Sequence, residues 1–330
     1  MSTTPKVMTP FPSLFTSSEG TLSVFDVVTR TLTNTQAVLE MIEQANPNAR
    51  NSSLMVAVDI QQLCAHSPDA MLAALHLQSD RFAYPIYHPL HQAVLCEILS
   101  ESFGLPEHDR RTLVCAALTA NVSIIALQET LFYQETPLTE DQRDAVRRHP
   151  QESLHLLRAA GISNPFWLKI VAQHDEYTDG TGSPKGLKGK EIIHEAQILS
   201  VCDRYTALLS PRSYRHAIPA TEALNRFFKE IDKQYNKTIV HGLLAHLSLY
   251  PPGCFVRLSN MEVGIVVRRG EPDPARPMVV VFEDASGRRL EEPVLRDCFY
   301  DLSIKTFCSP SDFQDLNYET IWHSATESMY

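Results

Sequence analysis

The chain has 330 residues, of which 44% are hydrophobic and 21% are charged, a composition typical of a soluble globular protein with two or three domains. Its formal net charge of −10 argues against broad contact with a nucleic-acid backbone, because such contact needs a basic face. A local basic cluster for a small anion is compatible with this charge, whereas the lack of about 18 uninterrupted apolar residues argues against a membrane span.

Residues 1–19 have the character of a flexible arm. They contain one basic residue and no apolar core of the kind found in signal peptides. The seven cysteines of the chain are scattered and none belongs to a C-x-x-C pair, which is typical of free, mostly buried thiols in a reducing compartment. We therefore expect a cytoplasmic protein.

Residues 1–80 are expected to form an N-terminal region of unknown role that contains helices. Between 22 and 42, apolar residues recur at three- and four-residue steps, which predicts one or two helices. The apolar run 55–58 fits either a strand or a helix, and 69–77 is predicted as a helix. No pattern in this region points to chemistry.

From residue 81 to about 250, the pattern predicts about seven consecutive helices and hence a helical bundle. The Thr-x-x-Gln sequence at 139–142 has the spacing of a capping box that begins one helix. Pro150 suits the early part of the run to Ala160, which Gly161 closes. A later helix is predicted over 221–231. The Pro-Pro-Gly sequence at 251–253 ends the bundle.

Residues 251–310 contain β-branched runs separated by turn residues, which predicts a small antiparallel β segment, barrel-like in form. Residues 311–330 show no period, and we expect them to be a loosely held tail. The sequence as a whole therefore predicts a mainly α protein with a small C-terminal antiparallel β segment and an N-terminal helical region.

The most distinctive sequence is a glycine-rich loop at 173–184, Gln-His-Asp-Glu-Tyr-Thr-Asp-Gly-Thr-Gly-Ser-Pro. A helical run over 192–209 follows, and Asp203 lies inside it. A His–Asp pair at the end of one helix, a tight loop and a further Asp in the next helix form a pattern by which helical proteins build a metal site.

This region resembles the HD-GYP branch of the HD-domain metal-dependent phosphohydrolases. The family reads His-His-Glu-x-x-Asp-Gly-x-Gly-Tyr-Pro at the loop and Val-Ala-Asp-x-Tyr-Asp-Ala-Leu-Thr-Ser in the next helix, where this chain has Val-Cys-Asp-Arg-Tyr-Thr-Ala-Leu-Leu-Ser at 201–210. The resemblance covers about residues 84–258 and implies an HD-type helical bundle over 81–250. It also implies two or three bound iron or manganese ions and hydrolysis of a phosphodiester, typically the bacterial messenger cyclic di-GMP.

Compared with the family, five metal-binding positions keep side chains that can bind a metal, and four functional positions do not. The candidates for metal binding are His88, His149, His174, Asp175 and Asp203. The replaced positions are the name-giving His–Asp pair, now Ala120 and Asn121, the lysine beside the scissile phosphate, now Ile124, and the Tyr of Gly-Tyr-Pro, now Ser183. The resemblance therefore implies a degenerate member with no intact catalytic set.

Asn121 limits how many ions the site can hold. The Asp at this position bridges both metals in the family, whereas neutral Asn121 offers one weak carbonyl oxygen. His88 and Asp203 are then too few ligands for one ion, but the other three candidates form a set of two His and one carboxylate. We expect either no bound ion or one divalent ion, which would be iron, manganese or zinc.

Each candidate also has an ordinary structural interpretation. A lone His on an apolar helix is usually a hydrogen-bonded core residue, and a buried Asp203 needs a cation or a hydrogen-bond donor, which Arg204 or a bundle His can supply. The glycines can serve only to permit a tight turn, and the basic residues near them can form a solvated face. The candidates for binding an anionic ligand are Asp179, Gly180, Gly182, Lys185, Arg212 and Arg215.

Two functions are compatible with these residues. The first is a catalytically inactive or severely impaired protein that acts as a sensor or interaction scaffold in cyclic di-GMP signalling, with cyclic di-GMP and other signalling proteins as partners. The alternative is a metal-dependent phosphodiesterase that acts on cyclic di-GMP or another phosphoester through a reduced one-metal site. If the bundle follows the family, the five retained side chains should converge on one cavity.

Overall fold

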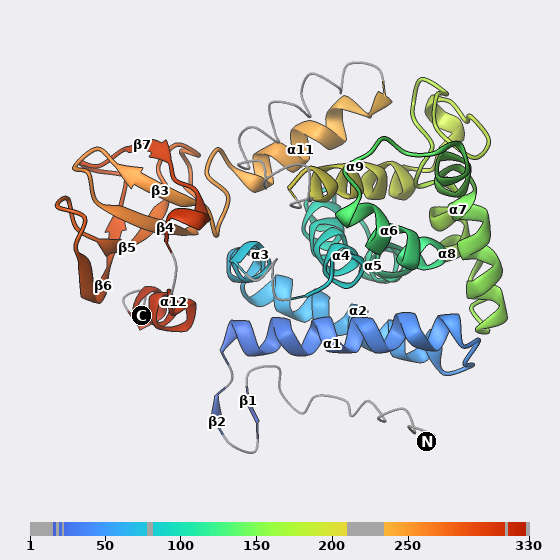
Figure 1. Ribbon diagram of the computed structural model, residues 1–330, viewed down its shortest axis with the longest axis horizontal. Coiled ribbons are helices and arrows are strands. Elements are labelled where there is room, and N and C mark those ends of the chain that lie inside the picture. Colours follow the sequence, from blue (N-terminus) through green and yellow to red (C-terminus); the bar gives the residue numbers. More distant parts are fainter. Residues whose placement is uncertain are drawn as a thin grey trace.

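The computed structural model describes residues 16–17, 20–21, 23–77, 82–209, 234–313 and 316–327. Figure 1 shows a body of packed helices with a smaller sheet at one end of the long axis. This arrangement confirms the predicted class, mainly α with a small C-terminal antiparallel sheet. The predicted helix over 221–231 and the candidates Arg212 and Arg215 lie outside the described residues.

The helical body comes first in the chain, and one further helix follows the sheet. The α-helices are α1 (Val24–Glu43), α2 (Ala49–His66), α3 (Pro68–Leu77), α4 (Tyr84–Ser102), α5 (Glu107–Thr119), α6 (Ile125–Tyr133), α7 (Glu140–Ala159), α8 (Pro165–Gln173), α9 (His194–Leu209), α11 (Lys237–Leu247) and α12 (Tyr318–Glu327). Short 3₁₀ helices are η1 (Val122–Ile124), η2 (Gly189–Glu191) and η3 (Pro310–Asp312).

Local sequence signals fix the ends of α7. Thr139 and Gln142 form the predicted capping box at its start, with reciprocal hydrogen bonds of 3.2 and 2.9 Å between side chains and backbone. Gly161 follows its end with φ +79°, a value that suits glycine. Pro150, which was expected early in a helix, lies in the middle of α7. The ambiguous run 55–58 is helical, because it lies inside α2 and contributes Val56 and Ala57 to the core.

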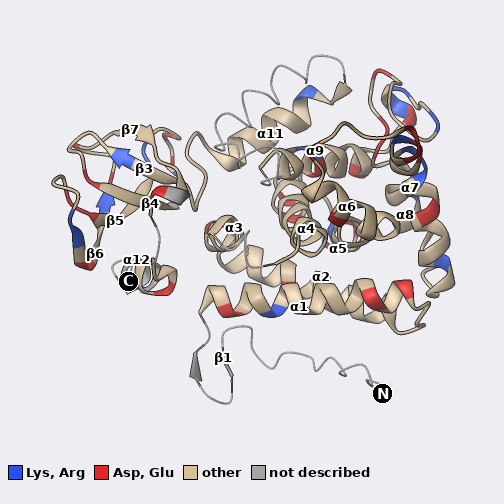
Figure 2. Cartoon of the chain, in the orientation of Figure 1, with Lys and Arg blue, Asp and Glu red and all other residues tan. Residues whose placement is uncertain are grey.

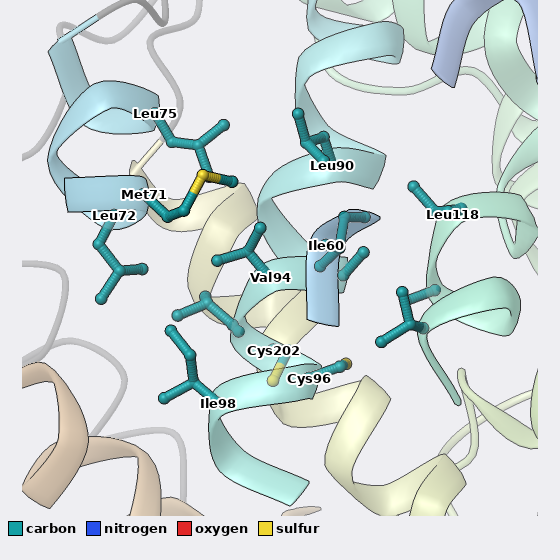
Figure 3. Close-up of a cluster of buried hydrophobic side chains, with 14 of the residues drawn as sticks. Ile60, Met71, Leu72, Leu75, Leu90, Val94, Cys96, Ile98, Leu118 and Cys202 are labelled. Atoms are coloured by element: carbon teal, nitrogen blue, oxygen red, sulfur yellow. The ribbon is translucent and has the colours of Figure 1, made fainter. Parts of the chain in front are cut away.

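Helix α4 is the centre of the body. It is buried on nearly all sides and packs against α5, α9, α1, α2 and α3, as expected for a helix that is apolar around its circumference. Figure 3 shows Leu90, Val94 and Cys96 of α4 among apolar side chains of the neighbouring helices. All seven cysteines are free thiols and five are buried, as predicted. Polar groups inside this core, such as His88, are therefore held in fixed surroundings.

The distribution of charged residues and the one long apolar stretch are both those of a helical body with a buried core. In Figure 2 acidic and basic residues are interspersed over both parts of the molecule. One described helical stretch, Glu107–Tyr133, is long and apolar enough to cross a membrane by length and composition. The stretch is interrupted by η1, and 61% of its most apolar window is buried inside the protein. We therefore assign it to the core of the helical body.

The C-terminal sheet has five antiparallel strands in the order β6-β5-β4-β3-β7. The strands are β3 (Phe255–Leu258), β4 (Val263–Arg268), β5 (Met278–Glu283), β6 (Arg289–Asp297) and β7 (Ile304–Phe307), and a separate short hairpin pairs β1 (Thr16–Ser17) with β2 (Gly20–Thr21). Alternate residues face opposite sides, so Phe255 and Val280 join the main core while Val256 and Val279 form a second apolar cluster.

The sheet docks on α3 through the Pro-Pro-Gly junction. The backbone N–H of Arg269 donates to Asp69 of α3 at 3.0 Å, and the two side chains form an ion pair. Nδ1 of His76, also on α3, donates to the Pro252 carbonyl at 2.6 Å. Gly253 has φ +91°, and a Cβ there would lie 2.8 Å from the His76 side chain. Glycine is needed at this position for both reasons.

The end of the chain corrects one prediction. Residues 311–330 were expected to be a loosely held tail, but 318–327 form α12, which packs on β5 and β6. Trp322 is buried, and its ring meets that of Phe25 on α1 at a centroid distance of 6.2 Å. Phe313 stacks on Phe255 of β3 at 5.6 Å. The absence of a long apolar period misled the prediction, because a few large aromatic residues hold this short helix.

Candidate functional site

A cavity of about 630 Å³ lies between α4, α6, α7 and α9. Four of the five candidate metal-binding residues line it, namely His88, His149, Asp175 and Asp203. The fifth, His174, lies directly behind this lining, with its Nε2 atom 3.1 Å from Nε2 of His149. Asn121 and Ile124, at two of the replaced family positions, line the same cavity. The structure thus brings the retained and the replaced positions to one place.

At one side of the cavity, Asp203 is held by two neighbours. Nε2 of His88 donates to its Oδ1 at 2.9 Å, and Nδ2 of Asn121 donates to the same oxygen at 3.1 Å. Burial acts to raise the pKa of Asp203, but the His88 hydrogen bond and the charges of His88 and His174 outweigh it and lower that pKa below its usual value. Asp203 is therefore an ionised carboxylate that already has hydrogen-bond donors.

At the other side, two histidines face each other. Their rings come from the middle of α7 and the end of α8, and both Nδ1 atoms lie near backbone carbonyls, that of His149 2.6 Å from Val146 O and that of His174 2.8 Å from Val171 O. Because a carbonyl can only accept, each Nδ1 carries a proton, and the two Nε2 atoms face each other 3.1 Å apart. Such an arrangement needs a cation or a shared proton between the two nitrogens.

Asp175 completes this group. Its carboxylate oxygens lie 3.5 Å from Nδ1 of His149 and 3.8 Å from Nε2 of His174. The three side chains each offer one ligand atom, and these atoms lie within 4.8 Å of one another. Burial lowers the pKa of His149, despite the opposing charge of Asp175, so that its ring is predominantly neutral and able to act as a ligand. The donor set fits one divalent ion.

The glycine-rich loop is built around Glu176, which is buried. The Glu176 carboxylate accepts hydrogen bonds from the backbone N–H groups of Lys185 at 2.7 Å and Leu187 at 2.9 Å. The Ser183 N–H donates to the Asp175 carbonyl at 2.9 Å. A Cβ on Gly182 would lie 2.2 Å from the Tyr177 nitrogen, so only glycine permits this close approach. The loop fixes the position of Asp175.

The candidate ligand-binding residues of the loop serve its own structure. Asp179 accepts hydrogen bonds from the Thr181 side chain and backbone, which lower the pKa of its carboxyl. Gly180 has φ +84°. The described candidates Asp179, Gly180, Gly182 and Lys185 are not among the residues that line the cavity, and neither is Ser183. Ala120 is fully buried at the end of α5.

The order of these elements matches a known family. Residues 62–239, more than half of the chain, match the model of the family described as HD domain. The chain belongs to the HD-domain family. The match begins inside α2, ahead of the bundle start expected from the sequence.

This HD-domain chain has relatives of known name. It is 27% identical over 249 residues to the cyclic di-GMP phosphodiesterase PA4108 of Pseudomonas aeruginosa, covering 74% of this chain and 58% of the relative. It is 33% identical over 150 residues to the cyclic di-GMP phosphodiesterase response regulator RpfG of Xanthomonas campestris pv. campestris, covering 44% of this chain and 39% of the relative. The 3'3'-cGAMP-specific phosphodiesterase 3 of Vibrio cholerae is 28% identical to it over 230 residues, covering 65% of this chain and 49% of the relative. The chain spans about half the length of the curated relatives it matches.

The fold of this HD domain also has a solved counterpart. Bd1817, an HDG"Y"P protein from Bdellovibrio bacteriovorus, superposes with a TM-score of 0.60 at 17% identity, over 71% of this chain and 75% of that chain. At this identity the similarity shows the fold alone. It supports the expected HD-type helical bundle.

Sequence reasoning missed the outer wall of the HD-domain cavity. Tyr84, Gln128 and Phe132 line it, as does Arg204, which had been considered only as a partner of Asp203. Tyr84 precedes His88 by one helical turn, and the two rings stack with centroids 4.9 Å apart. That four-residue spacing was the one available signal for this wall.

Proposed function

We propose that this HD-domain protein binds a cyclic dinucleotide of the cyclic di-GMP type in the cytoplasm and hydrolyses it very slowly or not at all. In this proposal it acts as a sensor or interaction scaffold, with other signalling proteins as partners. The names of its relatives support the ligand class, since they include cyclic di-GMP and 3'3'-cGAMP phosphodiesterases. The cavity volume lies within the range of small-molecule sites.

The observation that carries the proposal is the hydrogen bonding of Asp203. One of its carboxylate oxygens already accepts from both His88 and Asn121, so the side of the site that would hold a second ion is closed by neutral or paired groups. Ile124 adds an apolar surface to the cavity at the position of the family's lysine. Loss of one ion and of a cation beside the phosphate should lower a hydrolysis rate by several orders of magnitude.

A second candidate function is favoured by His149 and His174. Their facing Nε2 atoms, with Asp175 beside them, are suited to hold one divalent ion. An ion bound there would act as a Lewis acid on a phosphoryl oxygen. The alternative is therefore a one-metal phosphodiesterase in which the three side chains bind the ion and Asp203 keeps His88 oriented.

Metal content and turnover, measured on the same protein, distinguish the two functions. Protein purified without oxygen is analysed for iron, manganese and zinc, and is then titrated calorimetrically with cyclic di-GMP, with and without Mn²⁺. The proposal expects binding of cyclic di-GMP and no product above a control without protein. Hydrolysis that depends on metal and is lost in His174→Ala would establish the one-metal enzyme instead, and absence of binding would overturn the proposed role as a cyclic di-GMP sensor.

A further inference from the structure

One part of the cavity lining is a wall of aromatic and amide side chains. It consists of Tyr84 on α4 together with residues of α6 and of the segment 134–138 that follows it. The Phe132 and Tyr84 rings stack at 6.1 Å, and the Tyr84 and His88 rings stack at 4.9 Å. A row of three rings thus runs from the outer wall to the acidic and histidine side, which suits a ligand with a planar base at one end.

Two glutamines of this wall differ in the hydrogen bonds that their side-chain amides make. Gln134 accepts a hydrogen bond from Gln142 at 2.7 Å and donates one back at 3.1 Å, so its amide closes the loop before α7. Gln128, which also lines the cavity, has an Oε1 atom that is shielded from solvent and has no hydrogen-bond partner among the residues that the structure describes. A buried carbonyl oxygen without a donor destabilises the free protein.

We propose that Gln128 is a specificity-determining residue whose amide turns toward the cavity on ligand binding, so that Oε1 accepts a hydrogen bond from an N–H group of a purine base bound against Phe132 and Tyr84. The inference rests on the proposed function, because it assumes that the ligand is a purine cyclic dinucleotide. In this arrangement the phosphate end lies toward the histidines. Arg204, which lines that side of the cavity, provides the positive charge for it.

The proposal predicts opposite effects of Gln128 on stability and on affinity. The change Gln128→Leu keeps much of the side-chain volume and removes the unsatisfied oxygen, so the melting temperature of the ligand-free protein should stay the same or rise. Its affinity for cyclic di-GMP, measured by calorimetry, should fall about tenfold, the effect of losing one hydrogen bond. The matched change Gln134→Leu, in the same wall, should instead lower the melting temperature, because its partner Gln142 loses both hydrogen bonds.

The outcomes separate this inference from the proposed function. If the wild-type protein binds neither cyclic di-GMP nor 3'3'-cGAMP, the proposed function is wrong and this inference is wrong with it. If the wild type binds one of them and Gln128→Leu binds it equally well, only the inference is overturned. A melting temperature of ligand-free Gln128→Leu several degrees below wild type also overturns it, because the amide would then have a structural role.

Discussion

Asn121 and His88 donate to the same oxygen of Asp203, at 3.1 and 2.9 Å, and Asn121 stands at the position where the resemblance to HD-GYP proteins implies a metal-bridging carboxylate. The neutral amide donates a hydrogen bond to Asp203, whereas a carboxylate in the same place would repel it unless a cation lay between them. In the proposed function, an amide at this position therefore leaves a hydrogen-bonded group where a second cation would otherwise bind.

Restoring the family's His–Asp pair at positions 120 and 121 should remove the Asn121–Asp203 hydrogen bond and favour metal binding. The double variant Ala120→His and Asn121→Asp adds an imidazole and a carboxylate at the end of α5, and we expect the bound iron or manganese to rise above the wild-type content, measured by elemental analysis. Hydrolysis of cyclic di-GMP, followed chromatographically, should remain low because Ile124 still lacks a positive charge. A double variant with no additional metal would contradict this account of Asn121.

Divalent metal should stabilise the wild-type protein through the facing histidines. A ligand that binds only the folded state adds about 2.7 kcal/mol at 100 times its dissociation constant, so Mn²⁺, Fe²⁺ or Zn²⁺ should raise the melting temperature by a few degrees. The shift should vanish in His174→Ala and persist in His155→Ala, an exposed histidine on α7. If none of the three ions changes the melting temperature, the two rings share a proton and the one-metal enzyme is excluded.

Glu176 should contribute to stability through the glycine-rich loop. The change Glu176→Gln replaces one accepting oxygen by an NH₂ group that faces a backbone N–H, which should cost about 1–3 kcal/mol. Urea unfolding would show this as a lower midpoint, with the exposed Glu129→Gln as the control. Equal midpoints for the two variants would mean that the loop does not depend on this carboxylate.

Asp59 on α2 should make stability depend on pH. Burial raises the pKa of Asp59 to about 6, although the charge of Arg30 acts in the opposite direction. Since the folded state holds this proton more tightly than the unfolded state, the contribution favours folding at low pH and is lost as pH rises through about 6. Asp59→Asn should therefore stabilise the protein, by about 1 kcal/mol at pH 8 and by less at pH 5. Urea unfolding at both pH values tests this, and an equal gain at both would contradict it.

The sheet should not fold without the helices that cover it. A fragment of residues 253–310 lacks both α3 and α12, so the inner face with Phe255 and Phe282 would be exposed. So small a segment buries too little surface to be stable alone. Circular dichroism of the fragment should show no cooperative thermal transition. A sharp transition would show that the sheet is an independent domain.

Much of the architecture was predictable because it rests on repeated local signals. Helical periodicity and the capping box at Thr139 predicted the bundle, and β-branched runs predicted the sheet. The spacing of the family motif predicted which residues come together at the cavity. The sequence could not show the state of Gln128, because an unsatisfied atom is defined by its surroundings. It also could not show α12, which is held by contacts with residues far away in the chain.

The aromatic contact between Trp322 and Phe25 joins the last described helix of the chain to the first long one. The start of α1 and the helix α12 thus lie at the same corner of the molecule, beside the sheet in Figure 1. From that corner α1 runs for 20 residues, about 30 Å, and packs on η1 and α7, the elements that flank Asn121 and carry His149. A single helix therefore connects the corner where Trp322 packs to the elements that carry the candidate site.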